Sequence, residues 1–430
     1  LTIDQCRVQV PSIADGSVCF QLVASPKAYV LEPGSGRLYE LREPLGEPTG
    51  RAFHSAVPLP DGRVLLAGGV DAAVLTFTPL DGGTGWFPNL VPVAAGADGK
   101  GMHTTFEVFD PNRNALEGNP NRDGDPGRGG FAGLGNLASP RLFSVAAPWP
   151  NTDPARVVLL GGVDPTPAPT TRPSMTWENW DSINNTSEMS SGTLLRARAM
   201  AGVAKMHYDA SPNLWIIGGA AEATNDTDVV VIWENGAMAT SPLSPGSTHA
   251  AKNFLLPAVT PLGNVGAPVA QLVVGSFGPR CTYDETTEVY TPTYDTTAGL
   301  CPPSEAPPYV INRSTPTVRL DAITGWDAAS DAPHIFGAAV TLGDGSAVVV
   351  GGASGFDFAA TRAAHRVSWT GDAAQKDGSM PATAYPVPTL FPAGSATATG
   401  DAVFFGGVSV TLTGTPALQL VESVVLYNRE

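Results

Sequence analysis

Three features of this 430-residue sequence predict an all-β fold in which four-stranded repeats close into a single ring. Short apolar runs end in a pair of small residues six times along the chain. Over much of the sequence these pairs recur about every 55 residues, which is close to the length of a propeller blade. The 48 glycines and 40 prolines indicate many tight turns between short strands. The predicted architecture is a β-propeller, and the first residues of the six pairs are Gly68, Gly161, Gly218, Gly275, Gly351 and Gly406.

Residues 1–27 are predicted to form an extension before the ring, which occupies 28–430. Cys6 and Cys19 lie near each other in the sequence, as do Cys281 and Cys301, so each pair is expected to form a disulfide. Unpaired structural thiols are the alternative. A disulfide closing such a short loop contributes on the order of 3 kcal/mol, and two near pairs favour an oxidising compartment. The start at Leu1, without a methionine or a signal peptide, predicts that an upstream segment is removed, either by processing or by truncation, and export is the simplest explanation.

Each repeat follows one plan. A strand of small and apolar residues is followed by a polar turn, such as 60–63, and then by the apolar strand that ends in Gly-Gly. After a variable loop comes a second β-rich run, as in 105–111 and 229–235, and then a short outer strand. Glycine has no Cβ, so a glycine pair lets the chain leave a crowded strand in conformations closed to other residues. The fourth repeat departs from the plan, because Ser276 replaces the second glycine.

The two ends of the chain predict how the ring closes. The last repeat stops at 424–427 without an outer strand, whereas 29–33 and 37–41 resemble strands that no Gly-Gly strand precedes. We expect N-terminal strands to complete the C-terminal blade, which removes exposed sheet edges. The sequence predicts six blades. Seven remains the alternative, because several strand-like runs lie within 17–41. The segments 70–103, 111–138 and 277–315 are predicted to be insertions.

This plan resembles the kelch motif, in which an inner strand, a Gly-Gly strand, a strand ending near Tyr-Asp-Pro and an outer strand make one blade. The runs 105–111 and 424–428 carry the third strand, although the usual outer-strand tryptophan is mostly missing. The resemblance covers nearly the whole predicted ring. It implies that the loops entering the inner strands and the loops after the Gly-Gly strands gather on one face, around a central channel, where a partner binds.

Basic residues enter several of the predicted inner strands. The protein has a net charge of −16, so bases gathered at one face would create a local positive funnel suited to an acidic ligand or protein segment. The alternative is that they satisfy backbone carbonyls and carboxylates between blades, as kelch arginines and histidines commonly do. These candidate binding residues are Arg51, His54, Arg141, Arg196, Arg198, His249, Lys252 and His334.

The predicted insertion 277–315 combines the second cysteine pair with several tyrosines, among them Tyr283 and Tyr290. Tyrosine offers contact area and a hydroxyl group at little entropy cost, so this segment is a candidate recognition loop. A disordered segment held by one disulfide is the alternative.

A second candidate site lies in the insertion after Asp110. Asn119, Asn121, Asp123 and Asp125 place oxygen ligands at alternate positions, as in the first half of an EF-hand calcium loop. Asp110 is a further oxygen ligand in the same region. Gly130 stands where the bidentate acid of that loop would be, so a solvated polar turn is the alternative. Ca²⁺ is the one cofactor that the sequence suggests.

The catalytic relatives of kelch propellers require particular sets of residues. Copper radical oxidases resembling galactose oxidase need two tyrosines, two histidines and a cysteine cross-linked to a tyrosine. The chain has only six histidines, and its four cysteines suit disulfides better, so copper is not expected. Sialic acid mutarotase-like kelch enzymes would use arginines and acidic residues at the channel mouth, and Arg51, Arg141, Arg198 and His334 could take part.

The predicted function is an exported, non-catalytic binding or assembly module that recognises a protein or glycan partner through channel-mouth loops. A carbohydrate-active enzyme and a calcium-dependent adhesion protein are the alternatives. The negative charge argues against nucleic acid, and no apolar stretch approaches the roughly 18 residues of a membrane helix. We expect the periplasm, the cell surface or an extracellular assembly. The excess of arginine over lysine, with abundant alanine, favours a bacterial source.

Overall fold

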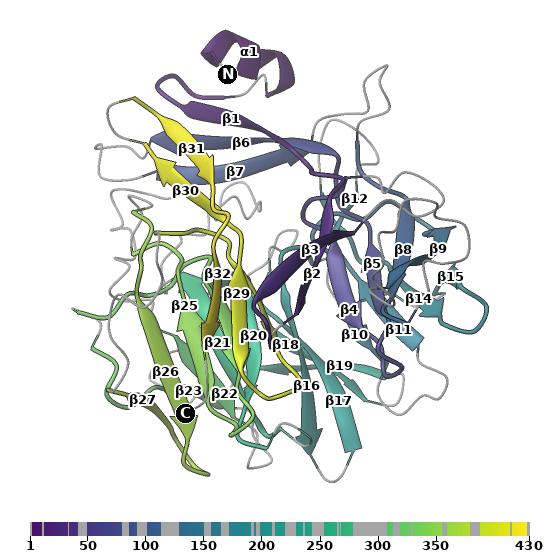
Figure 1. Cartoon of the computed structure of the whole chain (residues 1–430), viewed down its shortest axis with the longest axis vertical. Coiled ribbons are helices and arrows are strands. Elements are labelled where there is room, and N and C mark those ends of the chain that lie inside the picture. The colour runs from purple at the N-terminus through teal and green to yellow at the C-terminus, as the bar shows by residue number, and fades with distance from the viewer. Residues whose placement is uncertain are drawn as a thin grey trace. The chain divides into compact units, whose positions relative to one another are not determined.

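A computed structural model gives the structure of the chain (Figure 1). It describes residues 2–10, 13–32, 34–41, 50–79, 86–92, 101–112, 129–149, 156–164, 172–190, 193–194, 198–208, 211–219, 229–234, 237–242, 253–264, 266, 268–277, 308–312, 319–327, 330–354, 359–378, 388–412 and 415–427.

Nearly all of the described elements are strands. In chain order they are α1 (Ile3–Gln9), β1 (Val18–Val23), β2 (Ala28–Glu32), β3 (Arg37–Leu41), β4 (Ser55–Pro58), β5 (Val64–Ala67), β6 (Ala72–Pro79), β7 (Trp86–Pro92), β8 (Thr105–Asp110), β9 (Gly130–Asn136), β10 (Val145–Pro148), β11 (Arg156–Leu160), β12 (Val163–Asp164), β13 (Arg172–Pro173), β14 (Trp177–Asp181), β15 (Thr186–Met189), β16 (Gly202–Tyr208), β17 (Ser211–Ile217), β18 (Val229–Glu234), β19 (Ala237–Pro242), β20 (Asn253–Leu262), β21 (Ala270–Phe277), β22 (Tyr309–Asn312), β23 (Arg319–Ala322), β24 (Ala338–Thr341), β25 (Ala347–Val350), β26 (Ala364–Trp369), β27 (Ala374–Asp377), β28 (Ala393–Ala396), β29 (Ala402–Phe405), β30 (Val408–Thr411), β31 (Ala417–Leu420) and β32 (Val424–Tyr427).

The chain forms two compact units. The first unit comprises residues 1–13, 19–76 and 89–199, and the second comprises 14–18, 77–88 and 200–430.

The first unit contains two four-stranded antiparallel sheets, in the orders β4-β5-β8-β9 and β10-β11-β14-β15. Their inner strands, β4 and β10, lie next to each other, and the Ser55 hydroxyl donates to the Ser144 carbonyl at 2.7 Å. Phe106 and Trp180 pack edge to face between the sheets, with ring centroids 6.0 Å apart. Such ring pairs contribute beyond the area that they bury.

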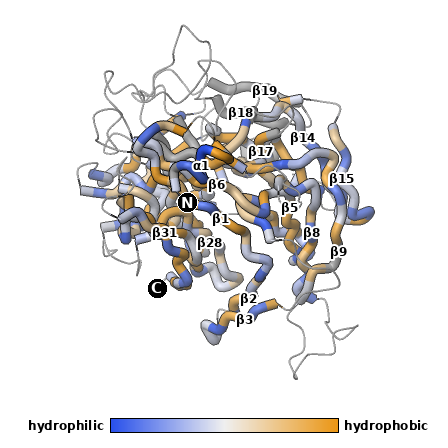
Figure 2. Tube along the Cα trace, turned by 90° about the horizontal axis from the view of Figure 1, so that it is seen from above, coloured by the Kyte–Doolittle hydropathy of each residue, from blue (hydrophilic) through white to orange (hydrophobic). Residues whose placement is uncertain are grey.

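The second unit repeats this arrangement in the sheets β16-β17-β18-β19, β20-β21-β22-β23 and β24-β25-β26-β27, followed by the three-stranded sheet β28-β29-β32. The inner strands β16, β20, β24 and β28 are neighbours in that order. Thr260 and Thr341 join β20 to β24 through hydroxyl oxygens 2.6 Å apart. Apolar side chains fill the space between the sheets, among them Leu272, Val349 and Val367. In Figure 2 hydrophobic residues follow strands such as β5, whereas the hairpin β2–β3 carries residues of both kinds.

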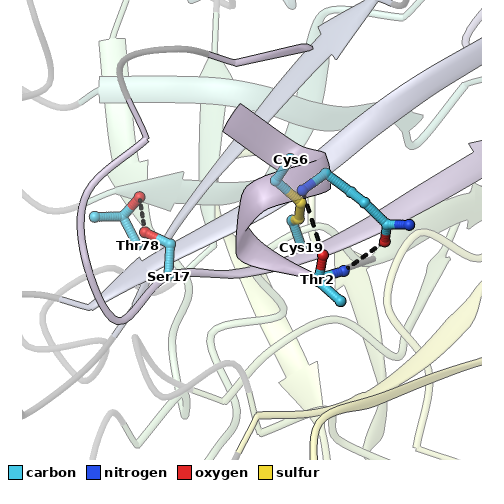
Figure 3. Close-up of a disulfide and its surroundings, with 6 residues drawn as sticks. Thr2, Cys6, Ser17, Cys19 and Thr78 are labelled. Atoms are coloured by element: carbon cyan, nitrogen blue, oxygen red, sulfur yellow. Dashed lines mark hydrogen bonds between the residues drawn. A yellow bond between two sulfur atoms is a disulfide. The ribbon is translucent and has the colours of Figure 1, made fainter. Parts of the chain in front are cut away.

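A small additional sheet has the order β1-β6-β7. It brings a strand of the predicted N-terminal extension together with two strands of the predicted insertion 70–103. The disulfide between Cys6 and Cys19 joins α1 to β1 (Figure 3), with the two Cα atoms 6.6 Å apart. Thr2 caps α1, because its hydroxyl accepts from the Gln5 amide at 3.3 Å. The disulfide packs with Val10, Ile13 and Val74 in a buried cluster.

Both residues of the Gly-Gly pairs have left-handed backbones. For example, φ is +61° at Gly161 and +95° at Gly162. A Cβ on Gly161 would also collide with the Arg198 carbonyl oxygen. Glycine is therefore required at this position by conformation and by the close approach of another segment.

The all-β prediction is confirmed. The structure forms five four-stranded sheets and one three-stranded sheet of the predicted type within the described residues. The strands β2 and β3 pair with each other, and β32 is the last strand of its three-stranded sheet. Six blades and closure by the N-terminal strands stay predictions.

Candidate functional site

One backbone feature recurs at the inner strands, at the strand entry in five cases and at a register shift inside β20 in the sixth. A bulky apolar residue adopts a left-handed conformation there, at a cost of order 1–3 kcal/mol for a residue with a Cβ. We call these the rim residues: Phe53 (φ 56°), Phe143 (φ 54°), Met200 (φ 60°), Leu256 (φ 47°), Phe336 (φ 59°) and Phe391 (φ 55°).

Hydrogen bonds from the Gly-Gly pairs position the strand entries. The Gly69 amide donates to the carbonyl of Arg141, and the Gly162 amide donates to that of Arg198, both at 2.7 Å. The Gly352 amide makes the same bond to Thr389 in the second unit, also at 2.7 Å. In each case the accepting residue lies two positions before a rim residue, so the glycine pair holds the backbone that leads to that residue.

Contacts between rim residues are also specific. In the first unit the rings of Phe53 and Phe143 lie 5.1 Å apart. In the second unit Phe336 and Phe391 stack at 4.8 Å, and the Phe391 amide donates to the Phe336 carbonyl at 2.9 Å. The Leu256 amide donates likewise to the carbonyl of Met200 at 2.8 Å. A ring contact thus joins two rim residues of the first unit, and backbone hydrogen bonds join two pairs of them in the second.

Rim residues of the second unit remain partly open to solvent. Met200, Leu256 and Phe391 are half-buried, and Phe336 is buried. Three apolar residues with a left-handed backbone are therefore partly exposed at the inner strands β16, β20 and β28.

The side chain of Arg51, in contrast, is almost fully buried at 4% exposure and lies 3.1 Å from the Glu107 carboxylate. Its guanidinium donates to the carbonyls of Gly68 at 2.8 Å and Thr105 at 3.1 Å. It also donates to the Thr105 hydroxyl at 3.0 Å. The charge of Arg51 is thus neutralised inside its sheet.

Arg141 repeats the arrangement in the next sheet. It forms a buried ion pair with Glu178 and donates to the Gly161 carbonyl at 2.6 Å. It also donates to the carbonyl and the hydroxyl of Thr176, at 3.2 Å and 3.1 Å. Both arginines occupy the environment that the sequence left open as an alternative, with carbonyls and a carboxylate as partners. A buried pair of this kind is costly to break, because one charge is left uncompensated.

Two further predicted residues lie at the same entries. Arg198 is buried, and its amide donates to the Ser174 carbonyl at 3.0 Å. His54 lies with Nδ1 3.1 Å from the carbonyl oxygen of Arg51. Burial lowers the pKa of His54, and the Arg51 charge lowers it further. Since a carbonyl only accepts, Nδ1 of His54 is the donor.

His334 occupies the corresponding position in the sheet β24-β25-β26-β27, and it is fully buried. Its Nδ1 lies 2.6 Å from the Gly351 carbonyl oxygen, and its Nε2 lies 2.7 Å from Nδ1 of His365 on β26. Burial lowers the pKa of His334 to about 3, helped by the neighbouring His365. His334 is therefore neutral at neutral pH. Here a histidine pair replaces the Arg–Glu pair of the first unit.

The histidine pair continues toward the surface. His365 Nε2 lies 3.2 Å from Oδ1 of Asp331, whose Oδ2 forms an ion pair with Lys376. Burial, the largest single influence, raises the pKa of Asp331, but the hydrogen bonds from Lys376 and the Asp327 amide, together with nearby positive charge, outweigh it and lower the pKa of that carboxyl. Trp326 covers His365 with ring centroids 4.6 Å apart.

Several predicted site residues lie outside the described part of the chain. Among the described candidates, Asp110 at the end of β8 accepts a hydrogen bond from the Asn112 amide at 2.8 Å. Within the residues that the structure describes, no group of three or more histidine, cysteine or acidic side chains is arranged to hold a metal. The candidates outside it are Arg196, His249, Lys252, Tyr283, Tyr290, Asn119, Asn121, Asp123, Asp125, Cys281 and Cys301.

Sequence reasoning missed the acidic partners of the two arginines and the rim itself. Glu107 follows Thr105 and Phe106, and Glu178 follows Thr176 and Trp177, so a Thr-aromatic-Glu pattern marked both. In both sheets the threonine and the glutamate contact the same arginine. His365 and Asp331 carried no comparable pattern.

Among the described residues, no helix has the length and apolar character needed to cross a membrane.

Comparison with protein-family models finds no match, and neither does comparison with curated proteins. The solved structures with a similar fold include that of YjhT, at 10% sequence identity and a TM-score of 0.50, covering 87% of this chain and 94% of YjhT. They also include a copper-bound fungal alcohol oxidase of the AA5 family, at 11% identity and a TM-score of 0.53, covering 95% of this chain and 72% of the oxidase. Similarity at this level of identity concerns the fold alone. Together with the repeated antiparallel sheets, it gives this chain a β-propeller fold.

Proposed function

We propose that this chain is a kelch-like propeller that acts as a non-catalytic binding module and recognises a protein or glycan partner at its strand entries. The observation that carries the proposal is the rim of the second unit, where Met200, Leu256, Phe336 and Phe391 share one left-handed conformation. Bulky residues held in a costly conformation often belong to binding surfaces, where the surrounding structure maintains them.

The charge distribution favours an apolar contact over an acidic ligand. Arg51 and Arg141 each face a glutamate and backbone carbonyls, so their charges are compensated within the sheets. His334 is neutral because burial lowers its pKa to about 3. These three bases therefore contribute little positive field at their strand entries.

The chemistry of the rim suits two kinds of partner group. An aromatic ring such as Phe391 packs against the C–H face of a sugar or against an apolar side chain of a protein. Half-buried Met200 and Leu256 add flexible apolar contact area beside it.

Export is part of the proposal. The Cys6–Cys19 disulfide is compatible with an oxidising compartment, since such bonds rarely persist in the cytosol. The alternative of calcium-dependent adhesion rests on Asn119, Asn121, Asp123 and Asp125, together with Asp110. It predicts that a chelator lowers thermal stability and that Asp123→Ala removes this effect.

The proposal is tested with a glycan array and with capture of proteins from the source's extracellular fraction. Phe391→Asn and Met200→Asn delete rim groups while keeping a residue that tolerates the left-handed conformation. Phe405→Asn is the matched control, because Phe405 is 43% exposed on β29 and is not a rim residue.

If the rim variants lose binding and the control keeps it, the proposal is supported. Equal binding by all variants contradicts it. Specific turnover of a bound sugar that survives purification would replace the binding module with the carbohydrate-active alternative. Arg51→Ala is a poor test of catalysis, because it also breaks a buried ion pair and lowers stability.

A further inference from the structure

A chain of three polar contacts links Gly351 to Asp331 through two histidines. The contacts are Gly351 O to His334 Nδ1 at 2.6 Å, His334 Nε2 to His365 Nδ1 at 2.7 Å, and His365 Nε2 to Asp331 Oδ1 at 3.2 Å. Its members come from the end of β25, the entry to β24, strand β26 and the segment before β24. The binding module proposed above does not depend on this chain of contacts.

Counting protons shows that the chain is one proton short when both histidines are neutral. A carbonyl oxygen and a carboxylate only accept hydrogen bonds, so both ends of the chain are acceptors. Three contacts between two accepting ends require three protons. Two neutral imidazoles carry one N–H each and supply two.

The distances indicate which contact lacks its proton. The two short contacts, at 2.6 Å and 2.7 Å, are satisfied when His334 and His365 both carry their proton on Nδ1. The remaining contact, from His365 Nε2 to Asp331, is the longest at 3.2 Å. In this state His365 Nε2 and the carboxylate are two acceptors facing each other.

We propose that Nε2 of His365 binds one proton, and that this proton forms a hydrogen bond between strand β26 and Asp331. We call this hydrogen bond the latch. The incoming proton turns an acceptor–acceptor contact into a charge-assisted hydrogen bond from imidazolium to carboxylate. His334 keeps its one proton and its bond to Gly351. The chain then holds three hydrogen bonds in place of two.

The charged groups around this site set the pH at which it fills. Burial lowers the pKa of His365, and the positive Lys376 on β27 lowers it further, whereas Asp331 raises it. Trp326 covers the ring, and Lys376 lies 6.0 Å from the Trp326 centroid. The net effect lowers the pKa of His365, so the proton enters at a lower pH than at an ordinary histidine.

The latch acts on the segment that leads into β24. The Asp331 amide donates to the Asp327 carbonyl at 2.7 Å, and the Asp327 amide donates back to the Asp331 carboxylate at 2.7 Å. Asp331 thus organises this turn, and His334 and Phe336 follow it in sequence. The Asp331 carboxylate already accepts from the Asp327 amide and from Lys376. A third hydrogen bond to this carboxylate, from His365, holds the turn to the sheet more strongly in acid.

The proton site is tested by histidine-selective nitrogen-15 NMR of the wild-type protein between about pH 8 and about pH 5. We expect His365 to carry one proton, on Nδ1, at high pH and to gain a second on Nε2 with a midpoint below 6.5. His334 should keep its Nδ1 proton unchanged. Three results would overturn the proposal: His365 carries its high-pH proton on Nε2, His365 does not titrate, or His365 titrates together with His334.

The latch is tested by hydrogen exchange at the Asp327 and Asp331 amides, corrected for the intrinsic effect of pH. Acidification should slow exchange roughly tenfold in the wild type, as one additional hydrogen bond would. His365→Gln should abolish this change. His54→Gln is the matched control and should preserve it, because the recorded partner of His54 is a backbone carbonyl. Exchange that does not slow in the wild type, or that slows equally in His365→Gln, overturns the latch.

Discussion

Acid should destabilise this protein through His334. Burial lowers the pKa of His334 from its ordinary 6.5 to about 3, with a smaller contribution from His365. In the unfolded chain the same side chain titrates at its ordinary value. As the pH falls below 6.5, His334 binds a proton in the unfolded state but not in the native state. The free energy of unfolding therefore decreases between the two pKa values.

The size of the effect follows from the two pKa values. One pKa unit corresponds to about 1.4 kcal/mol. At about pH 5 the unfolded side chain is almost fully protonated, about 1.5 units below its pKa, while the buried side chain remains neutral. His334 alone should therefore remove about 2 kcal/mol of unfolding free energy between about pH 7.5 and about pH 5.

Urea unfolding followed by circular dichroism across this pH range measures the loss. In His334→Gln the side chain does not titrate, so the fall in stability should shrink by about 2 kcal/mol relative to the wild type. Val349→Ala is the matched control, because it weakens the buried core of the same sheet without removing a titrating group. It should lower stability at every pH and keep the wild-type slope. A wild-type slope in His334→Gln would refute the reasoning.

Three further predictions concern the fold. Glu178→Ala leaves Arg141 buried without its carboxylate and should cost roughly 3–5 kcal/mol in chemical unfolding. Arg319→Ala, which breaks a partly exposed pair with Asp321, should cost at most about 1 kcal/mol. Similar costs for the two variants would contradict the buried pairing. Gly161→Ala should lower the melting temperature, because the new Cβ would collide with the Arg198 carbonyl oxygen. Gly378→Ala should leave the melting temperature nearly unchanged, because no atom lies within 4 Å of a Cβ there. A Gly161→Ala variant as stable as the wild type would show that the close approach is absent. Removing the Cys6–Cys19 disulfide with Cys19→Ser should cost on the order of 3 kcal/mol of unfolding free energy. Reducing agent should lower the melting temperature of the wild type. It should leave the melting temperature of the double variant Cys19→Ser, Cys281→Ser unchanged.

Much of the fold was predictable because glycine pairs report a local backbone requirement. Gly68, Gly161, Gly351 and Gly406 all have the left-handed backbone for which glycine is best suited, so their spacing marked the strands correctly. The Cys6–Cys19 pair was also predictable from proximity in sequence. The sequence did not indicate that β1 and β6 share a sheet. Pairing between distant strands is set by tertiary contacts that the local pattern does not contain.

The candidate site was predictable only in part. Arg51, Arg141 and His334 were identified at the strand entries, but their surroundings depend on where the third strand of each sheet places Glu107, Glu178 and His365. The rim residues were missed for a different reason. Phe53 and Phe391 are ordinary apolar residues in the sequence, and nothing local indicates that they adopt a conformation favoured by glycine.

The sequence by itself determined an all-β chain of repeated antiparallel units, because strand periodicity and glycine placement are local properties of the backbone. It also determined which types of side chain stand at the strand entries. Only the tertiary structure decided what those side chains do. Burial and the approach of a third strand turn Arg51 and Arg141 into internal ion pairs and keep His334 neutral. Charge and protonation depend on the surrounding atoms, and those atoms come from segments far apart in the chain.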